Sequence, residues 1–252
     1  MKKKTGILSK IYIAILLIFL YSPIAVLIFY SFNNGKTTVW KGFTFKWYVQ
    51  LFRDDNIMNA LWNTVIIAVL ASVFATILGT AAAIGISNFK GKKRMLIQNA
   101  SNIPIISPDI VMGVSLMLLF TTLGVIFNFE MGFFTVLISH ICFCVPFVVL
   151  NVMPRIKRMD QSIYDAALDL GCNQWHAFYK VIIHELMPGI FSGLLMSFTY
   201  SLDDFIITYF TRGAKFQNLS IEIYSMTHRR ISPKINALSA LLFLAVLIVM
   251  VI

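Results

Sequence analysis

Charged residues are scarce in this sequence, and acidic residues especially so. Only 13% of the residues are charged, and 11 acidic residues stand against 21 basic ones. Soluble domains carry about 25% charged residues. With 58% apolar residues and a mean hydropathy of +0.80, the chain has too little polar surface to cover a soluble globule. The composition therefore predicts an integral membrane protein.

The motifs of common enzyme classes are also missing. The chain has no G-x4-G-K-[ST] phosphate loop, no serine–histidine–aspartate arrangement and no spacing of zinc ligands. Its three cysteines do not form a disulfide framework. We therefore expect no catalytic residue, no metal and no cofactor. The net charge of +10 comes from basic residues that flank apolar runs, which favours contact with membrane lipid over nucleic acid.

Six apolar runs are present, and each is near or above the roughly 17–25 residues that a spanning helix needs. We therefore expect an all-α membrane protein, with one transmembrane domain over residues 1–252 and both termini on the same side. The expected spans are about 11–32, 61–87, 95–123, 133–152, 188–210 and 236–252. The sixth run is the shortest and has no basic flank, so we expect the polypeptide to continue beyond Ile252.

The basic residues predict the orientation of these spans. In this topology, 12 basic residues lie on the side of the N-terminus and 9 on the opposite side. The densest clusters are short and lie at 2–4 and 90–94. Cytoplasmic loops of membrane proteins carry an excess of lysine and arginine. The N-terminus is therefore expected in the cytoplasm.

Small residues recur at every fourth position in two of the expected spans. The two ladders are Ala71, Ala75, Gly79 and Ala83, and Gly189, Gly193, Ser197 and Ser201. Small residues at this spacing let helix backbones approach closely in lipid. The ladders predict a bundle in which these two faces pack against neighbouring helices.

The segment 153–187, called the polar loop below, carries charges of both signs between two apolar blocks. Asp160 or Ser162 can cap a short helix, and Gly171 can end it in a left-handed conformation. Asn173 can then cap a second helix that leads into the fifth span. Such a polar hairpin predicts a docking surface outside the bilayer, and an ordinary amphipathic surface helix is the alternative.

Part of the polar loop matches a known motif. The pattern is Asp165-Ala166-Ala167-x3-Gly171-x9-Val181-x-Ile183. It resembles the EAA loop of the permease subunits of ABC importers, with Asp165 in place of the usual glutamate and His184 in place of proline. Other matching segments are Ser107-Pro108-Asp109, Ser201-Leu202-Asp203-Asp204 and Tyr224-Ser225-Met226. Over nearly its whole length, the chain is similar to permease subunits of spermidine/putrescine importers.

The resemblance implies a type I importer permease (MetI-like) fold in a bacterial cell membrane, with a cytoplasmic coupling helix. The residues that it implies in docking the ATPase are Asp165, Ala166, Ala167 and Gly171. It further implies a second, homologous permease subunit, a dimer of ATP-binding subunits and an extracytoplasmic polyamine-binding protein. The chain would be the pore-forming subunit, without enzymatic activity of its own, and would import polyamines by alternating access.

Three acids lie within apolar runs that contain no lysine or arginine: Asp109, Asp203 and Asp204. An acid near the bilayer centre costs about 2.5–3.5 kcal/mol to insert and is a candidate for function. Counted along their spans, Asp109 and Asp203 fall at similar depths. Unpaired acids at one level suit a cationic polyamine, and an aromatic face such as that of Tyr224 can hold an ammonium group. Glu222, in the last outer loop, is a further candidate for the substrate pathway.

Each of these acids also has a structural interpretation. Asp109 follows Ser107 and Pro108, which together make a good helix start with a serine cap. Asp203 and Asp204 would lie about 100° apart on one helix, so we expect only one of them to face the pathway. His140 is interpreted as a packing histidine. The alternative functions are import of another solute, such as ferric ion, and proton-coupled secondary transport through the same acids.

Overall fold

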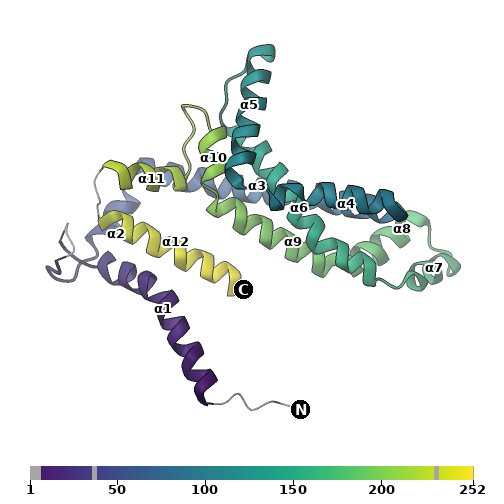
Figure 1. Cartoon of the computed structure of the whole chain (residues 1–252), viewed down its shortest axis with the longest axis horizontal. Helices are drawn as coiled ribbons and strands as arrows, with labels where there is room; N and C mark the ends of the chain where they lie inside the picture. Colours follow the sequence, from purple (N-terminus) through teal and green to yellow (C-terminus); the bar gives the residue numbers. More distant parts are fainter. Residues whose placement is uncertain (1–6, 36–38, 230–232, 252) are drawn as a thin grey trace. The chain divides into compact units, whose positions relative to one another are not determined.

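The computed structural model describes residues 7–35, 39–229 and 233–251. Within these ranges the chain is helical and contains no strand, apart from an isolated antiparallel bridge between Asn33 and Phe43. The chain divides into two compact units, one formed by Met1–Asn59 with Glu222–Ile252 and the other by Ala60–Ile221. Each unit is described below by itself (Figure 1).

The helices follow the expected apolar runs, with short helices between them. In chain order they are α1 (Ile7–Ser31), α2 (Lys46–Phe52), α3 (Asp55–Asn88), α4 (Gly91–Ile106), α5 (Asp109–Phe127), α6 (Phe133–Arg158), α7 (Gln161–Asp169), α8 (Gln174–Ala177), the π-helical segment η1 (Phe178–Ile182), α9 (Ile183–Asp203), α10 (Ile206–Thr211), α11 (Leu219–Arg229) and α12 (Pro233–Val251).

Among the residues that the structure describes, five helical stretches are long and apolar enough to cross a membrane. They are Ser9–Ser31, Asp55–Asn88, Asp109–Phe127, Phe133–Arg158 and Gln174–Asp203, and a shorter apolar helix covers Pro233–Ile248. Each of the six expected runs therefore contains an apolar helix, and the all-α membrane fold is confirmed. Two runs differ from the prediction because each contains a break.

In the first unit, Asn33 connects α2 to the C-terminal end of α1. The Asn33 side chain accepts hydrogen bonds from the backbone N–H groups of Gly35 and Lys41, at 3.1 and 2.9 Å. Its backbone carbonyl accepts a 2.7 Å bond from the indole N–H of Trp47 on α2. These bonds satisfy buried polar groups of a loop and hold the aromatic segment against α1.

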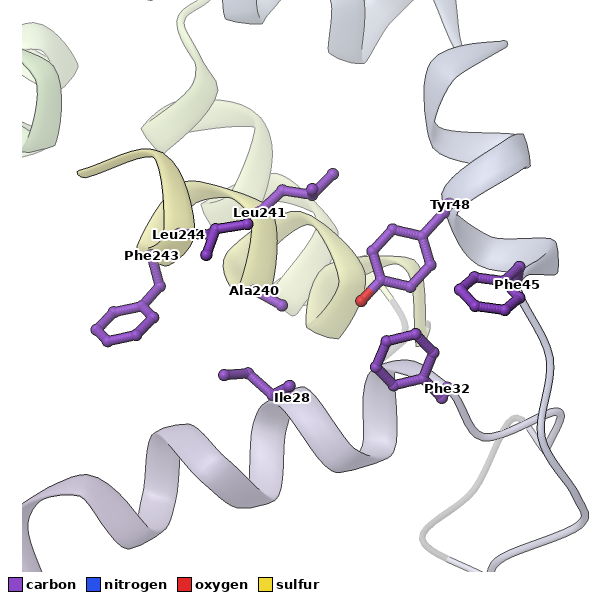
Figure 2. Close-up of a pocket in the computed structure, with 8 residues that line it drawn as sticks. All are labelled: Ile28, Phe32, Phe45, Tyr48, Ala240, Leu241, Phe243 and Leu244. Carbon is purple, nitrogen blue, oxygen red and sulfur yellow. The ribbon is translucent and has the colours of Figure 1, made fainter. Parts of the chain in front are cut away.

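An apolar cavity of about 430 Å³ lies within this unit, between α1, α2 and α12 (Figure 2). It is lined by Ile28, Phe32, Phe45, Tyr48, Ala240, Leu241, Phe243 and Leu244. The one polar side-chain group among these residues is the Tyr48 hydroxyl, which lies 2.6 Å from the Ser31 hydroxyl. Because none of the eight is charged, the cavity does not suit a charged ligand.

The second unit is built around α6. Val148 of α6 is fully buried, and both small-residue ladders meet it. A Cβ atom at Gly79 of α3 would lie 2.6 Å from the Val148 Cβ, and one at Gly193 of α9 would lie 3.2 Å from the Val148 Cα. Only glycine permits approaches this close. The prediction that the two ladders are packing faces is confirmed, and α6 runs beside α9 (Figure 1).

The third expected span, 95–123, is wrong in its N-terminal part. The chain breaks at Ser107, which is extended at ψ 140°, because a residue that precedes proline is disfavoured in a helix. The apolar run is therefore divided between α4 and α5, and Asp109 is the first residue of α5 rather than a residue deep within a span. The predicted serine cap is also wrong, because the Ser107 hydroxyl donates backwards to the Ile103 carbonyl at 2.9 Å.

The fifth expected span, 188–210, is broken as well. Helix α9 ends at Asp203, and α10 begins at Ile206. Asp203 and Asp204 therefore do not lie on one continuous helix, as predicted. Asp203 is the last residue of α9, and Asp204 lies in the extended link to α10. The polar groups at this break are satisfied by Asp204 itself and by side chains from neighbouring helices.

Candidate functional site

The break between α9 and α10 is held by the carboxylate of Asp204. This carboxylate accepts hydrogen bonds from the backbone N–H groups of Ile207 and Thr208, at 3.2 and 2.9 Å. It also accepts a 3.0 Å bond from the Thr208 hydroxyl. The first N–H groups of a helix have no partner within the helix, and a carboxylate that precedes them serves as their cap. Asp204 therefore starts α10.

His140 reaches this cap from α6. Its Nε2 lies 2.9 Å from the Thr208 hydroxyl oxygen and 3.4 Å from the Asp204 carboxylate, and its Nδ1 lies 2.7 Å from the Ser201 hydroxyl. Asn218 donates a 3.2 Å bond to the same Thr208 oxygen. We call these five residues the acid–histidine cluster.

The bonds of the cluster determine its proton arrangement. The Thr208 hydroxyl has one proton, which it donates to Asp204, so its oxygen must accept from both Asn218 and His140. His140 therefore carries a proton on Nε2, and a neutral ring leaves Nδ1 to accept from Ser201. The side chains of His140 and Asp204 are only 2% and 8% exposed. Every polar group is matched, as a buried polar cluster requires.

Asp203 differs from Asp204 in both its exposure and its hydrogen bonding. It ends α9, its side chain is exposed, and it makes no hydrogen bond or ion pair with any residue that the structure describes. Tyr200, one turn earlier on the same helix, is 40% exposed and stacks on Phe147 at 4.3 Å between ring centroids. Of the two adjacent acids, Asp203 is the one that remains available to bind a cation.

The third acid lies on a helix that packs beside this break. Asp109 is exposed in the first turn of α5, where a negative charge favours the helix dipole. One turn later, Gly113 is buried against α10, since a Cβ there would lie 2.8 Å from the Phe210 ring. The structure therefore brings together α5, which begins at Asp109, and α10, which begins two residues after Asp204.

The two remaining pathway candidates lie in the other unit. Glu222 and Tyr224 are both on α11, where Glu222 is half-buried and Tyr224 is 40% exposed. The Tyr224 ring contacts that of His228, with 4.2 Å between centroids.

The polar loop has the predicted caps. The Asp160 carboxylate accepts from the Ser162 backbone N–H at 3.0 Å and starts α7, and this hydrogen bond lowers the pKa of Asp160 below its usual value. At the other end Gly171 has φ +86°, and the Cys172 N–H bonds to the Ala167 carbonyl at 3.1 Å. These features form a glycine-terminated Schellman motif. Asn173 caps α8 through a 3.4 Å bond, so the predicted hairpin is confirmed.

The hairpin presents apolar side chains to its surroundings. Leu170, Trp175 and Tyr179 are 87%, 79% and 74% exposed, respectively. Asp165 and Ala166 of α7 are also exposed. Figure 1 places α7 at the far end of this unit from α10. Large apolar side chains exposed together on a polar element mark a surface for another protein.

The sequence analysis missed part of the role of His140 in the acid–histidine cluster. The packing role predicted for His140 is confirmed, but its link to Asp204 was not foreseen. The available signal was an ionisable residue within an apolar span, which is a functional candidate in itself. Thr208 and Asn218 carried no comparable signal.

A family model described as "Binding-protein-dependent transport system inner membrane component" matches residues 75–252. The chain belongs to this family. It is therefore a membrane-spanning permease subunit of an ABC importer, and such subunits form the pore.

Two relatives of this permease from Escherichia coli strain K12 carry functional names. The spermidine/putrescine transport system permease protein PotC is 36% identical over 234 residues, covering 92% of this chain and 87% of the relative. The putrescine transport system permease protein PotI is 37% identical over 237 residues, covering 92% and 84%.

Solved structures support the fold of the permease. A chain from a bacterial ABC transporter that imports the acidic polysaccharide alginate superimposes with a TM-score of 0.75. The match covers 97% of this permease and 93% of that chain, at 16% sequence identity. A second alginate transporter structure, in complex with a pentasaccharide-bound periplasmic protein, gives a TM-score of 0.65 at 20% identity. At these identities the likeness concerns the fold alone.

Proposed function

We propose that this permease carries polyamines, spermidine or putrescine, into the cell as half of a transmembrane pore. The observation that carries the proposal is Asp203, an exposed carboxylate without a cationic partner among the described residues, at the end of an apolar span. Relatives that are more than a third identical are named for spermidine and putrescine transport. A fixed anion in an apolar setting attracts an ammonium group strongly, because little water screens it.

The acids have different roles in this proposal. Asp203 contacts an ammonium group, and the nearby ring of Tyr200 offers an aromatic face for a cation. Asp109 supplies a second negative charge from α5, the helix packed on α10. Asp204 acts as the cap of α10 and keeps Asp203 in place. Glu222 and Tyr224 are proposed to contribute from α11.

Energy comes from a separate ATPase in this proposal. Two ATP-binding subunits bind on the cytoplasmic side, one to this permease and one to a second, homologous permease. The contact on this chain is Asp165, Ala166, Ala167 and Gly171, with the exposed apolar side chains of the polar loop around it. An extracytoplasmic polyamine-binding protein delivers the substrate, and the N-terminus lies in the cytoplasm.

The proposed cycle is alternating access. ATP binding closes the ATPase dimer, and α7 transmits this movement to α9 through the polar loop. The pore then opens outward and receives the polyamine from the binding protein. ATP hydrolysis restores the inward-facing state, and the substrate leaves into the cytoplasm.

Uptake of radiolabelled spermidine and putrescine tests the substrate and the role of Asp203. An Asp203→Asn variant keeps the size of the side chain and removes its charge. We expect uptake to fall about tenfold or more, since one charge-assisted hydrogen bond contributes about 1.5–3 kcal/mol. Expression and thermal unfolding should stay unchanged, because the side chain is exposed. Normal uptake by an Asp203→Asn, Asp204→Asn double variant would refute the proposed site.

A further inference from the structure

A second cavity, of about 370 Å³, lies within the second unit where two apolar helices end. It is lined by Ile84, Ser87, Asn88, Arg94, Ile156, Lys157, Met159, Ile182 and Leu186. The cavity has an apolar part formed by aliphatic side chains and a polar part formed by Arg94, Lys157, Ser87 and Asn88. A site with these two parts suits a ligand that has a charged head and an apolar body.

Both charged residues in the polar part of the cavity are basic. Arg94 comes from α4 and Lys157 from the last turn of α6. Neither side chain forms an ion pair with a residue in the described ranges, and the one hydrogen bond of the Arg94 guanidinium is a 3.8 Å contact with the Met153 sulfur. Two cations that line one cavity without an acid repel each other, and an anion in the cavity would offset this repulsion.

The start of α4 points to the same ligand. Its first turn carries Lys92, Lys93 and Arg94 and no acid, although a helix start favours negative charge. Its N-cap residue, Lys90, provides no side-chain hydrogen bond to the first N–H groups. This is a local conflict between sequence and helix dipole, and such conflicts mark functional positions. An anion at this end of α4 would resolve it.

The position of the cavity indicates where the anion comes from. The apolar helix α3 ends at Asn88, and α6 ends at Arg158 after a last turn with three basic residues. From these polar ends we infer that the cavity lies where both helices leave the hydrocarbon layer. Phosphate headgroups lie at this level, and basic pockets between membrane helices on the cytoplasmic side bind anionic lipid headgroups.

We propose that the cavity is a phosphate-binding site, with Arg94 and Lys157 as its cationic ligands, and that the headgroup of an anionic phospholipid fills it. The phosphate joins α4 to α6, and the aliphatic wall receives the start of an acyl chain. The polar loop begins directly after α6, so an occupied site fixes the base from which α7 projects. This inference does not depend on which solute the permease carries.

Ligand-induced stabilisation of the full chain tests the proposal. The permease, purified in neutral detergent with the subunits that co-purify, is titrated with dioctanoyl phosphatidylglycerol, dioctanoyl phosphatidylcholine or inorganic phosphate. The thermal unfolding temperature is followed, because a ligand that binds only the folded state raises it. We expect phosphatidylglycerol to raise it at lower concentration than phosphatidylcholine. A matching rise with inorganic phosphate would support the site and identify free phosphate as its ligand.

Two matched double variants distinguish binding in the cavity from nonspecific attraction to the positive charge of the protein surface. The Arg94→Gln, Lys157→Gln variant removes the two lining cations, and the Lys41→Gln, Lys46→Gln variant removes two exposed cations outside the lining and outside α4. We expect phosphatidylglycerol to bind the first variant about tenfold more weakly than the second, since only the first loses charge-assisted hydrogen bonds. Arg94→Lys keeps the charge and should bind more tightly than the first variant. Equal weakening in both pairs, or no rise with either anion in the unmodified chain, would overturn the proposal.

Discussion

The acid–histidine cluster and the polar loop are both polar interruptions of an apolar chain, but they are stabilised by different contacts. In the cluster, His140 bonds to residues 61 and 68 positions away, and both of its polar partners are buried. In the polar loop, Asp160 and Asn173 each bond to a backbone N–H two residues later, and both caps are exposed. The cluster fixes the geometry of a helix break, whereas the loop is capped by its own residues and keeps large apolar side chains exposed.

The largest effect is expected from placing a charge on the exposed surface of the polar loop. An Ala166→Asp variant should lose its ATPase subunit on co-purification, because the charge would have to be buried in the proposed contact. The thermal unfolding of the isolated chain should hardly change, since Ala166 is exposed. Ala166→Ser, which is small and neutral, is the matched control and should retain the subunit. Full assembly of the Ala166→Asp variant would contradict the docking role.

The next largest effect separates the two adjacent acids. Asp204→Ala leaves two backbone N–H groups and the Thr208 hydroxyl without their acceptor and removes the carboxylate beside a buried histidine. It should lower the free energy of unfolding by about 3 kcal/mol. Asp203→Ala should change it by less than about 0.5 kcal/mol, because Asp203 is exposed. Denaturant titration in detergent measures both. Equal losses would show that the break does not depend on the Asp204 cap.

A smaller effect is expected at the end of α7. Gly171 has φ +86°, and a Cβ atom in this conformation costs about 1–2 kcal/mol. Gly171→Ala should therefore loosen the Schellman motif, and hydrogen exchange at the Cys172 amide should become faster. Asparagine tolerates the left-handed region better, so Gly171→Asn should lie between the alanine variant and the natural chain. Unchanged exchange in Gly171→Ala would argue against the motif.

The smallest effect is the response of the α7 cap to acid. Because the hydrogen bond from Ser162 lowers the pKa of Asp160 in the folded chain, the cap is fully stabilising above the unfolded value, about 3.9. The stabilisation is lost as the pH falls through the lower, folded value. The protection of the Ser162 amide, which is the exchange rate of an unfolded chain at the same pH divided by its own exchange rate, should therefore fall below about pH 4. Asp160→Asn keeps a good capping side chain that does not titrate, and its exchange should not show this additional dependence.

The difference between the two regions explains what the sequence could predict. The polar loop was predicted well because its determinants are local: a capping aspartate, a glycine that ends the helix and a capping asparagine. The two small-residue ladders were also predictable, since spacing alone defines them. The helix break at Asp204 was not predicted, because it depends on Thr208, His140 and Asn218, which come together only in the folded chain.

The third expected span shows a second reason why sequence analysis misses a helix break. Ser107 lies within the run 95–123, which Pro104 and Pro108 interrupt, and hydropathy over a window averages the break away. Pro108 was the local signal for it, but the run was long enough to suggest a single helix. Among the site residues, the sequence identified Asp203 and Asp204 as a pair, but it could not show that the Asp204 carboxylate is already occupied. That distinction requires the hydrogen-bond partners of each side chain.

The π-helical segment at Phe178–Ile182 has a consequence for how movement reaches the pore. A π turn holds one more residue than an α turn and so sets the rotational phase between the helix before it and the helix after it. Removing one residue there would turn α7 by about 100° around the axis of α9. The helix caps of the polar loop and the packing of the Gly189–Ser201 ladder would be unchanged. The exposed surface of the polar loop would nevertheless face a new direction. In the proposed cycle, these five residues therefore set the direction in which the contact with the ATPase faces.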